Sequence, residues 1–309
     1  MESLALQLAS SVNAGTVLAL AALGLLVNER AGVINLGAEG MMLVGALAAY
    51  ATAFHSHSAA LGFAAGIATG AVLAAGFGGL VIWLSTNQYA TGLALSLFGG
   101  GFAAFAGTGY TDKQLPAQVA PHIPGIPGLA DVPFLGTALF GHHPVVYLAA
   151  ALGIAIAWFL HRSRAGLMLR AIGESPESAH AIGHPVRRIR LTAVMFGGAL
   201  CGLAGAYVAL AYTRLWVEGL TGGRGWIALA LTTFATWRPG RVLLGAYLFG
   251  AVTMLQFTLQ ARGVQIESHL LSMAPYLATI LVLVIISRKP AWIRLHMPAS
   301  LGKDFRPDT

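Results

Sequence analysis

Long apolar runs separated by short polar segments make up most of the sequence. The runs are about 15 to 25 residues long, and a helix needs roughly 20 apolar residues to cross the hydrocarbon core of a bilayer. The pattern therefore predicts an all-α polytopic membrane protein with about nine transmembrane helices, some of them interrupted, in a single domain over residues 1–309. The predicted spans are 10–27, 36–54, 59–83, 89–106, 144–161, 191–211, 223–237, 242–259 and 270–286.

The segment 28–42 interrupts this pattern between the first two spans. Its polar residues and glycines are Asn28, Glu29, Arg30, Gly32, Asn35, Gly37, Glu39 and Gly40. Such groups in a row are costly in lipid, so the segment predicts a break in a membrane helix. Asn35 is expected to cap the second span. Glu29 and Arg30 are expected at the membrane interface, with a topological role.

Small residues spaced four apart predict close contacts between helices. The third span carries such a series on one face, namely Gly62, Gly66, Gly70, Ala74 and Gly78. Gly198 and Gly202 repeat the pattern in the sixth span, and Gly37 and Gly40 are expected to let another backbone approach the second. Because the chain holds 39 glycines, chance alignment is the alternative.

The distribution of Lys and Arg predicts the orientation. With the loop 162–190 in the cytoplasm, most of the 18 basic residues fall on the cytoplasmic side, in agreement with the positive-inside rule. The N-terminus is then outside and the C-terminus cytoplasmic, in a multi-pass protein of the cell (inner) membrane. The segment 107–143, rich in proline and glycine, becomes a turn-rich extracytoplasmic loop.

Composition narrows the function classes. Of the 309 residues, 57% are hydrophobic and only 9% are charged, with a mean hydropathy of +0.73, whereas about 25% charged residues is usual for a soluble domain. No basic block is interleaved with aromatic residues, so the net charge of +7 does not indicate nucleic-acid binding. A single cysteine, Cys201, excludes an intrachain disulfide and a cysteine-based metal site. No metal or other cofactor is predicted.

The sequence lacks the common catalytic motifs. It contains no P-loop, no Gly-x-Ser-x-Gly and no His-Glu-x-x-His, so the chain is not expected to be an enzyme. Of its 11 acidic residues, only Glu39 falls inside a predicted span. The lack of a deep carboxylate weighs against an ion-coupled secondary transporter and suggests a path for a neutral solute. A channel or secondary transporter is the alternative of a different class.

The residues selected for this path are Asn35, Glu39, Trp226, Thr232 and Gln256, although hydroxyl groups in membrane helices often bond only to their own backbone. The seventh span, 223–237, is short: about 15 residues cover roughly 22 Å, less than a ~30 Å hydrocarbon core. Trp226 and Trp237 are expected to anchor its ends at the interfaces. Interrupted segments in both halves of a transporter point to the solute path, so 28–42 is a candidate for half of a gate.

The loop 162–190 contains the signals of a short helix over residues 176–182. Ser175 suits the N-cap, Pro176 the first helical position, and Gly183 the end of the helix. Ala179 and Ile182 lie three apart and share a small apolar face, which we expect to be exposed to the cytoplasm. A partner protein satisfies such a face better than water does. An ordinary basic loop is the alternative.

Several stretches resemble the permease subunits of ABC importers. Residues 32–42 resemble the signature of the simple-sugar and nucleoside type, within the wider class of branched-chain amino acid permeases. Residues 169–190, 197–205 and 223–230 agree with the same family, and the resemblance covers about residues 15–290. The loop 107–143 resembles the family little.

The resemblance implies a function and partners. The chain is expected to be a membrane-spanning permease subunit that imports a neutral polar solute, a nucleoside first, with a simple sugar or a branched-chain amino acid as alternatives. It implies a separate ABC ATPase subunit, a second permease (a homologous paralogue or a second copy) and an extracytoplasmic solute-binding protein. The short helix becomes the ATPase-coupling helix, with Arg170, Glu174, Pro176, Ala179, Ile182 and Gly183 as coupling residues.

Overall fold

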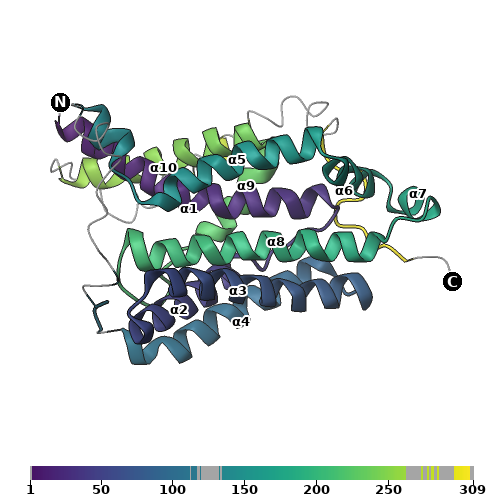
Figure 1. Ribbon diagram of the computed structural model, residues 1–309, viewed down its shortest axis with the longest axis horizontal. Helices are drawn as coiled ribbons and strands as arrows, with labels where there is room; N and C mark the ends of the chain where they lie inside the picture. Colours follow the sequence, from purple (N-terminus) through teal and green to yellow (C-terminus); the bar gives the residue numbers. More distant parts are fainter. Residues whose placement is uncertain are drawn as a thin grey trace.

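The computed structural model describes residues 2–111, 113–116, 119, 132, 134–261, 273, 277, 280, 281, 284 and 296–306. Within these residues the chain is helical and has no strand. The α-helices are α1 (Glu2–Arg30), α2 (Ala38–Ser56), α3 (Ala59–Gly78), α4 (Gln88–Gly107), α5 (Pro144–Arg162), α6 (Arg164–Glu174), α7 (Pro176–Ala181), α8 (Val186–Tyr207), α9 (Arg224–Phe234) and α10 (Pro239–Ala261). Most run side by side along the long axis of the molecule (Figure 1).

Short turns extend several of these helices. A π-helical turn continues α3 as η1 (Gly79–Trp83) and another continues α8 as η4 (Val208–Tyr212). A 3-10 turn, η2 (Thr108–Tyr110), follows α4, and η3 (Gly136–Phe140) precedes α5. All-helical architecture is therefore confirmed for the described residues.

Six of the described helical segments are long and apolar enough to cross a membrane. They are Leu4–Arg30, Ala59–Trp83, Gln88–Tyr110, Pro144–Arg162, Val186–Tyr212 and Pro239–Gln260. Each overlaps a predicted span. The ninth predicted span, 270–286, and much of the loop 107–143 lie outside the described residues, so the count of nine and the sides of the two termini stay predictions.

The two remaining predicted spans correspond to α2 and α9. Neither is among the helices that are long and apolar enough to cross a membrane. α9 has 11 residues, about 16 Å of helix. It is therefore even shorter than the span that the sequence predicted over residues 223–237. α2 is enclosed by α3, α4, α8 and α9. α9 packs against α1, α2 and α10.

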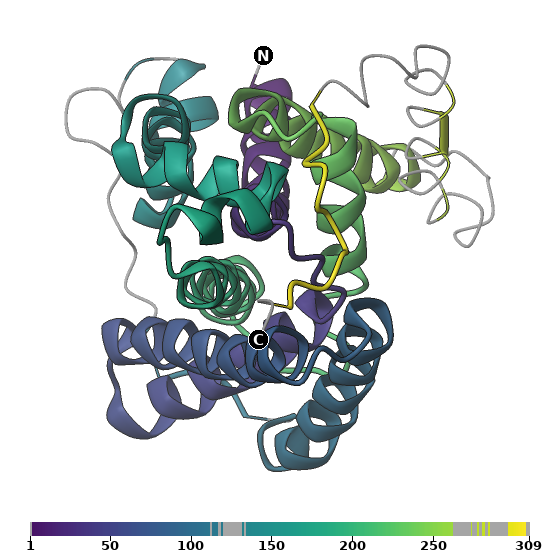
Figure 2. The same ribbon diagram turned by 90° about the vertical axis from the view of Figure 1, so that its right-hand side faces the viewer.

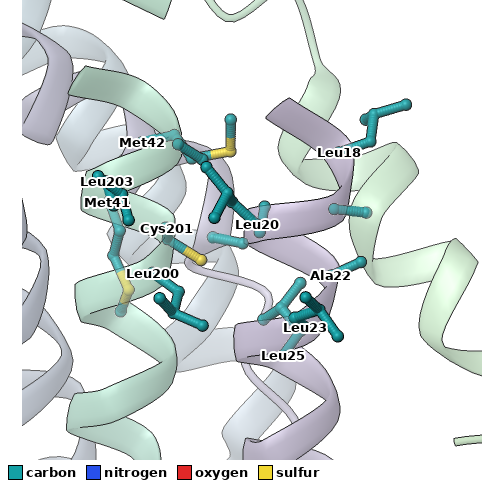
Figure 3. Packing of buried hydrophobic residues seen from close by; sticks show 14 of the residues in the cluster. Leu18, Leu20, Ala22, Leu23, Leu25, Met41, Met42, Leu200, Cys201 and Leu203 are labelled. Carbon is teal, nitrogen blue, oxygen red and sulfur yellow. The ribbon is translucent and has the colours of Figure 1, made fainter. Parts of the chain in front are cut away.

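The core centres on α1. Its residues from Val17 to Leu26 are almost fully buried, and α1 packs against α8, α9 and α10. Figure 3 shows its leucines beside Met41 and Met42 of α2 and beside Leu200, Cys201 and Leu203 of α8. Seen from the end that carries α6 and α7, α8 lies between α1 and the pair α2 and α3 (Figure 2).

The predicted glycine face of α3 packs closely against α8. A Cβ on Gly70 would lie 2.1 Å from the carbonyl oxygen of Gly198, and a Cβ on Gly202 would lie 2.1 Å from that of Gly66. The prediction of a packing face is confirmed, and the partner is the Gly198/Gly202 face of α8. Gly40 likewise lets α4 approach, since its Cβ would lie 2.5 Å from the Leu95 carbonyl oxygen.

Candidate functional site: two buried carboxylates that hold α9

The predicted helix break lies between α1 and α2. α1 ends at Arg30, residues 31–37 form turns and irregular backbone, and α2 begins at Ala38. Gly32 adopts a φ of +88°, where a Cβ would also meet Ser300 Oγ at 2.5 Å. In Figure 1 this dark purple connection runs back from the end of α1 toward the middle of the bundle. The connection therefore returns into the interior and does not form a surface loop.

Glu39, in the first turn of α2, binds the N-terminal end of α9. Its Oε1 accepts hydrogen bonds from the Thr221 hydroxyl (2.5 Å) and the Gly223 N–H (2.9 Å), and its Oε2 accepts one from the Gly225 N–H (2.6 Å). The side chain is only 8% exposed. Two N–H groups at the start of α9 that have no acceptor within the helix are thereby satisfied, and the carboxylate lies at the positive end of the helix dipole.

Glu29, in the last turn of α1, binds the other end of α9. Its Oε1 accepts from the Thr232 hydroxyl (2.9 Å) and its Oε2 from the Trp237 indole N–H (2.5 Å). The prediction that Glu29 has mainly a topological role was wrong, because α1 continues beyond residue 27 and the carboxylate is buried against α9. The prediction that only Glu39 lies inside a span was wrong for the same reason.

Trp237 follows the C-terminal end of α9, where it is buried, and it does not anchor this helix at a membrane interface. The side chain is 2% exposed, and Thr236 and Trp237 both adopt positive φ values, 50° and 52°, just beyond the helix end. This turn brings the indole to Glu29, and it places the Trp237 carbonyl oxygen within reach of the Arg30 guanidinium (2.9 Å from Nη2). The predicted interface role of Trp237 was wrong, and its backbone and side chain both hold the end of α1.

Asn35 is fully buried in the connection. Its Oδ1 accepts a hydrogen bond from the Gly37 N–H (2.9 Å), and its amide nitrogen lies 3.6 Å from the Met41 sulfur. The N-cap position of α2 is Gly37, which makes no side-chain cap. Asn35 therefore closes a turn that precedes α2, and the predicted capping of the helix itself was wrong.

The other predicted path residues separate into two groups. Thr232 belongs to α9 and bonds to Glu29, while Trp226 lies half-buried in the first turns of the same helix. Gln256 lies half-buried on α10, outside these hydrogen bonds. The structure thus brings together Glu39 and α9, but not Gln256.

Asn28 presents an unusual buried amide. It is fully buried in α1, and neither polar atom of its side chain has a hydrogen-bond partner among the described residues. It packs on Gly197 of α8, where a Cβ would lie 2.1 Å from Asn28 Oδ1. An unpaired buried amide lowers stability.

No local pattern in the sequence indicates the contacts of the C-terminal segment 296–306. The buried Arg190 donates to the Ala31 carbonyl oxygen (3.0 Å), to Ser300 Oγ (3.0 Å) and to the Lys303 carbonyl oxygen (3.4 Å). The Gly302 N–H donates to the Gly32 carbonyl oxygen (3.1 Å), and the Ser300 N–H to that of Gly173 (3.0 Å). This segment therefore connects α6 to the break between α1 and α2.

The predicted short helix is present as α7. Ser175 Oγ accepts from the Ser178 N–H (3.2 Å), Pro176 begins the helix, and Gly183 follows it with a φ of +89°. Ile182 is 75% exposed, as predicted, but Ala179 is only 3% exposed. Ala179 packs in a cluster with Ile172, Val186 and Phe305, so the expectation that both residues form one exposed face was wrong.

The predicted loop 162–190 also contains α6, which the sequence analysis missed. Ser163 caps it by accepting from the Gly166 N–H (2.9 Å), and its Leu169 and Ile172 are buried. Arg170 lies on this helix, with its Nε buried and without a partner among the described residues. Glu174 is exposed at the helix end and accepts from the Ala299 N–H (3.3 Å).

An apolar cavity beside α1 contains none of the predicted path residues. It measures about 390 Å³ and is lined by residues of α1, α5, α6 and α8, among them Val27, Phe159 and Phe196. Among the residues that the structure describes, no group of three or more His, Cys, Asp or Glu could hold a metal ion.

Comparison with known proteins places these features in a family. Residues 7–286 match the family described as "Branched-chain amino acid transport system / permease component". The chain is 41% identical to the putative glucose ABC transporter permease protein of Haloferax volcanii, with 96% of each chain covered. It is 32% identical to the guanosine ABC transporter permease protein NupQ of Bacillus subtilis (86% of this chain, 87% of the relative).

A nucleoside ABC transporter permease protein of Lactococcus lactis is 30% identical, with 87% of this chain and 88% of the relative covered. No solved structure matches the chain.

Proposed function

The chain belongs to the permease component family of branched-chain amino acid transport systems, and from this premise we propose that it forms one half of the membrane path of an importer for a neutral polar solute. It is an ABC transporter permease subunit and a multi-pass protein of the cell (inner) membrane. As a translocation subunit it does not hydrolyse ATP, which is the activity of a separate subunit. A nucleoside is the first candidate solute.

The observation that carries the proposal of a neutral solute is the position of Glu39. The N-terminus of an interrupted helix is a common binding site for an anionic group of a transported solute. Here the protein's own carboxylate occupies the N-terminus of α9, with three donated hydrogen bonds. An anionic solute at this place would meet a negative charge, whereas a neutral one would not.

Two relatives support a nucleoside, since one is named a guanosine permease and the other a nucleoside permease. A simple sugar is the second candidate, because the relative with 41% identity is named a putative glucose permease. Both solutes are neutral and rich in hydroxyl groups, so both agree with the Glu39 argument.

The junction of α2 and α9 is the proposed gate. Both helices begin inside the bundle, and Glu39 joins their N-terminal ends, so a shift of either helix changes the shape of the path beside them. In this proposal Asn35 and Glu39 hold the gate, while Trp226, Thr232 and Gln256 line the path. Glu29 and Trp237 fix the opposite end of α9 and keep it aligned.

The family also implies the other subunits of the importer and the sides of the membrane on which they bind. The C-terminus and α6–α7 lie on the cytoplasmic side and the N-terminus outside. α7 docks on the ATPase through the exposed Ile182, with Arg170, Glu174, Pro176, Ala179 and Gly183 shaping this end. A movement of α7 reaches the break through the C-terminal segment, which bonds to Gly32 and to Gly173. A second permease and an extracytoplasmic binding protein complete the importer.

The test is solute uptake in cells. A strain without this chain is compared with the same strain carrying it, using radiolabelled adenosine, guanosine, glucose, leucine or, as an anionic solute, glutamate. Restored uptake of a purine nucleoside, reduced by unlabelled nucleosides and not by glucose, supports the first candidate. Uptake of glucose alone supports the second, and uptake of an anionic solute would contradict the Glu39 argument.

A further inference from the structure

The apolar cavity between α1, α5, α6 and α8 has the size and lining of a ligand pocket. Its volume is about 390 Å³, within the range of ~300–1,000 Å³ that is usual for such pockets. Among the described residues Thr192 is its one polar lining residue, and the Thr192 hydroxyl already donates to the Ile189 carbonyl oxygen (2.9 Å). An apolar cavity offers water no hydrogen-bond partners, so an apolar ligand fits it better.

The cavity opens toward the membrane. Apart from Leu169 of α6, its lining residues belong to helical segments that are long and apolar enough to cross a bilayer. Ala155 and Thr192 are exposed and Phe196 is 38% exposed, so the cavity is accessible from outside the bundle. Hydrocarbon surrounds the bundle at the depth of such segments. An acyl chain of a lipid is therefore the apolar ligand that can enter.

Two arginines lie at one end of the cavity. Arg162 comes three residues after Phe159 on α5, and Arg188 comes four residues before Thr192 on α8, so each shares a helix face with a lining residue. Because α5 ends and α8 begins at the end of the molecule that carries α6 and α7, both arginines lie at that end (Figure 1). Both are exposed, and neither has a hydrogen-bond or ion-pair partner among the described residues.

We propose that this cavity binds one acyl chain of an anionic phospholipid, with the lipid phosphate between Arg162 and Arg188. The walls on α5 and α8 have the polarity of such a lipid, since both are apolar along the helix and positively charged at one end. A guanidinium group binds a phosphate in a planar, bidentate geometry, and the apolar stem of an arginine lies along hydrocarbon. The predicted orientation places this end on the cytoplasmic side, where the leaflet carries anionic lipids.

A second apolar cavity lacks these charges. It measures about 520 Å³ and lies between α3, η1 and α4, with Phe77, Ala94 and Phe98 in its lining. The three helical segments that form it contain no Lys or Arg. It can hold an acyl chain of any lipid, but it has no group that selects an anionic headgroup. The two cavities therefore provide an internal comparison.

The experiment measures lipid binding to the assembled permease pair, delipidated in detergent, by native mass spectrometry. Phosphatidylglycerol and phosphatidylcholine with the same acyl chains are titrated separately. We expect wild type to bind phosphatidylglycerol more tightly, and the Arg162→Gln/Arg188→Gln variant to lose about tenfold or more of this preference, because each arginine near an anionic headgroup strengthens binding. The Lys303→Gln/Arg306→Gln variant removes two exposed charges from the C-terminal segment and is expected to keep the preference.

Filling each cavity tests the apolar part of the site. Ala155→Trp places a large side chain in the proposed site and should weaken the binding of both lipids there. Ala94→Trp makes the same change in the uncharged cavity and should leave the preference for phosphatidylglycerol unchanged. A photo-crosslinker in place of Ala155 is expected to capture lipid in native membranes. Thermal unfolding, followed through the reactivity of the buried Cys201, establishes that the variants fold.

Three results would overturn the inference. One is equal binding of the two lipids to wild type, and another is an unchanged preference in the Arg162→Gln/Arg188→Gln variant. The third is capture of the second permease by the crosslinker at residue 155, because this face would then be the interface between the two permeases. None of these results depends on the transported solute, so the proposed function is tested separately.

Discussion

Glu39→Gln tests the contact between α2 and α9 most sharply. The amide oxygen can replace Oε1 and keep the bonds from Thr221 and Gly223. The NH2 group then replaces Oε2, which lies 2.6 Å from the Gly225 nitrogen, so two donors face each other. One charge-assisted bond is lost and a buried N–H is left unpaired, which together cost about 2–4 kcal/mol.

A thiol-reactive dye provides the assay. Cys201 is the only cysteine in the chain and is fully buried in α8, so it reacts only after the bundle opens. We expect Glu39→Gln to lower the midpoint of thermal unfolding by roughly 5 °C or more. Glu218→Gln is the matched control, because it makes the same change at an exposed position in the loop before α9.

A double-mutant cycle identifies the cause of the loss. In Gly225→Ala the new Cβ would lie 2.6 Å from the Glu39 backbone nitrogen and 2.7 Å from Glu39 Oε2, so this change displaces the first turn of α2 together with the carboxylate. If the two changes disrupt one contact, their combined effect is smaller than the sum of the single effects. A Glu39→Gln midpoint equal to that of wild type, or full additivity in the cycle, would refute the reasoning.

Three further changes test other parts of the fold. Asn28→Leu removes an amide with no partner among the described residues and should raise stability by about 1–3 kcal/mol in the same dye assay; a loss would show that the amide is paired. Gly202→Val places side-chain atoms against Gly66 and should prevent folding or lower the midpoint severely, whereas Gly101→Val, which has open space at its Cβ, should not. Burial lowers the pKa of His143 below its usual 6.5, with Arg214 adding to the effect. The folded state therefore binds fewer protons than the unfolded state in the window just below pH 6.5, so stability is full above that pH and falls as the pH decreases through the lowered pKa. The His143 side chain caps α5 by accepting from the Val145 N–H. His143→Asn keeps a capping side chain and should flatten this dependence; an unchanged slope would contradict the assignment.

Local signals were sufficient where one segment determines its own shape. Ser175, Pro176 and Gly183 predicted α7 almost to the residue, because capping and helix termination depend on the neighbouring backbone. The spacing of glycines in α3 predicted a packing face for a similar reason, since helix geometry alone puts such residues on one side.

Contacts between distant segments account for the errors. Glu29 bonds to Trp237, 208 residues away, and no local pattern indicates that the last turn of α1 will be covered there. Ala179 was assigned to an exposed face because its partner Phe305 comes from the C-terminal segment. Glu39 was selected as a path residue, but its three donors lie on a loop and helix 182 to 186 residues later in the chain, where no local pattern indicates them.

The most direct test of the central claim is ATP-driven uptake into proteoliposomes. The vesicles contain this chain, its partner permease, the ATPase and the binding protein, and uptake of a radiolabelled purine nucleoside is measured with ATP, without ATP and with this chain omitted. The account predicts uptake only when ATP and this chain are both present. Uptake of equal rate without ATP or the ATPase would contradict it, because the chain would then be a channel or a secondary transporter.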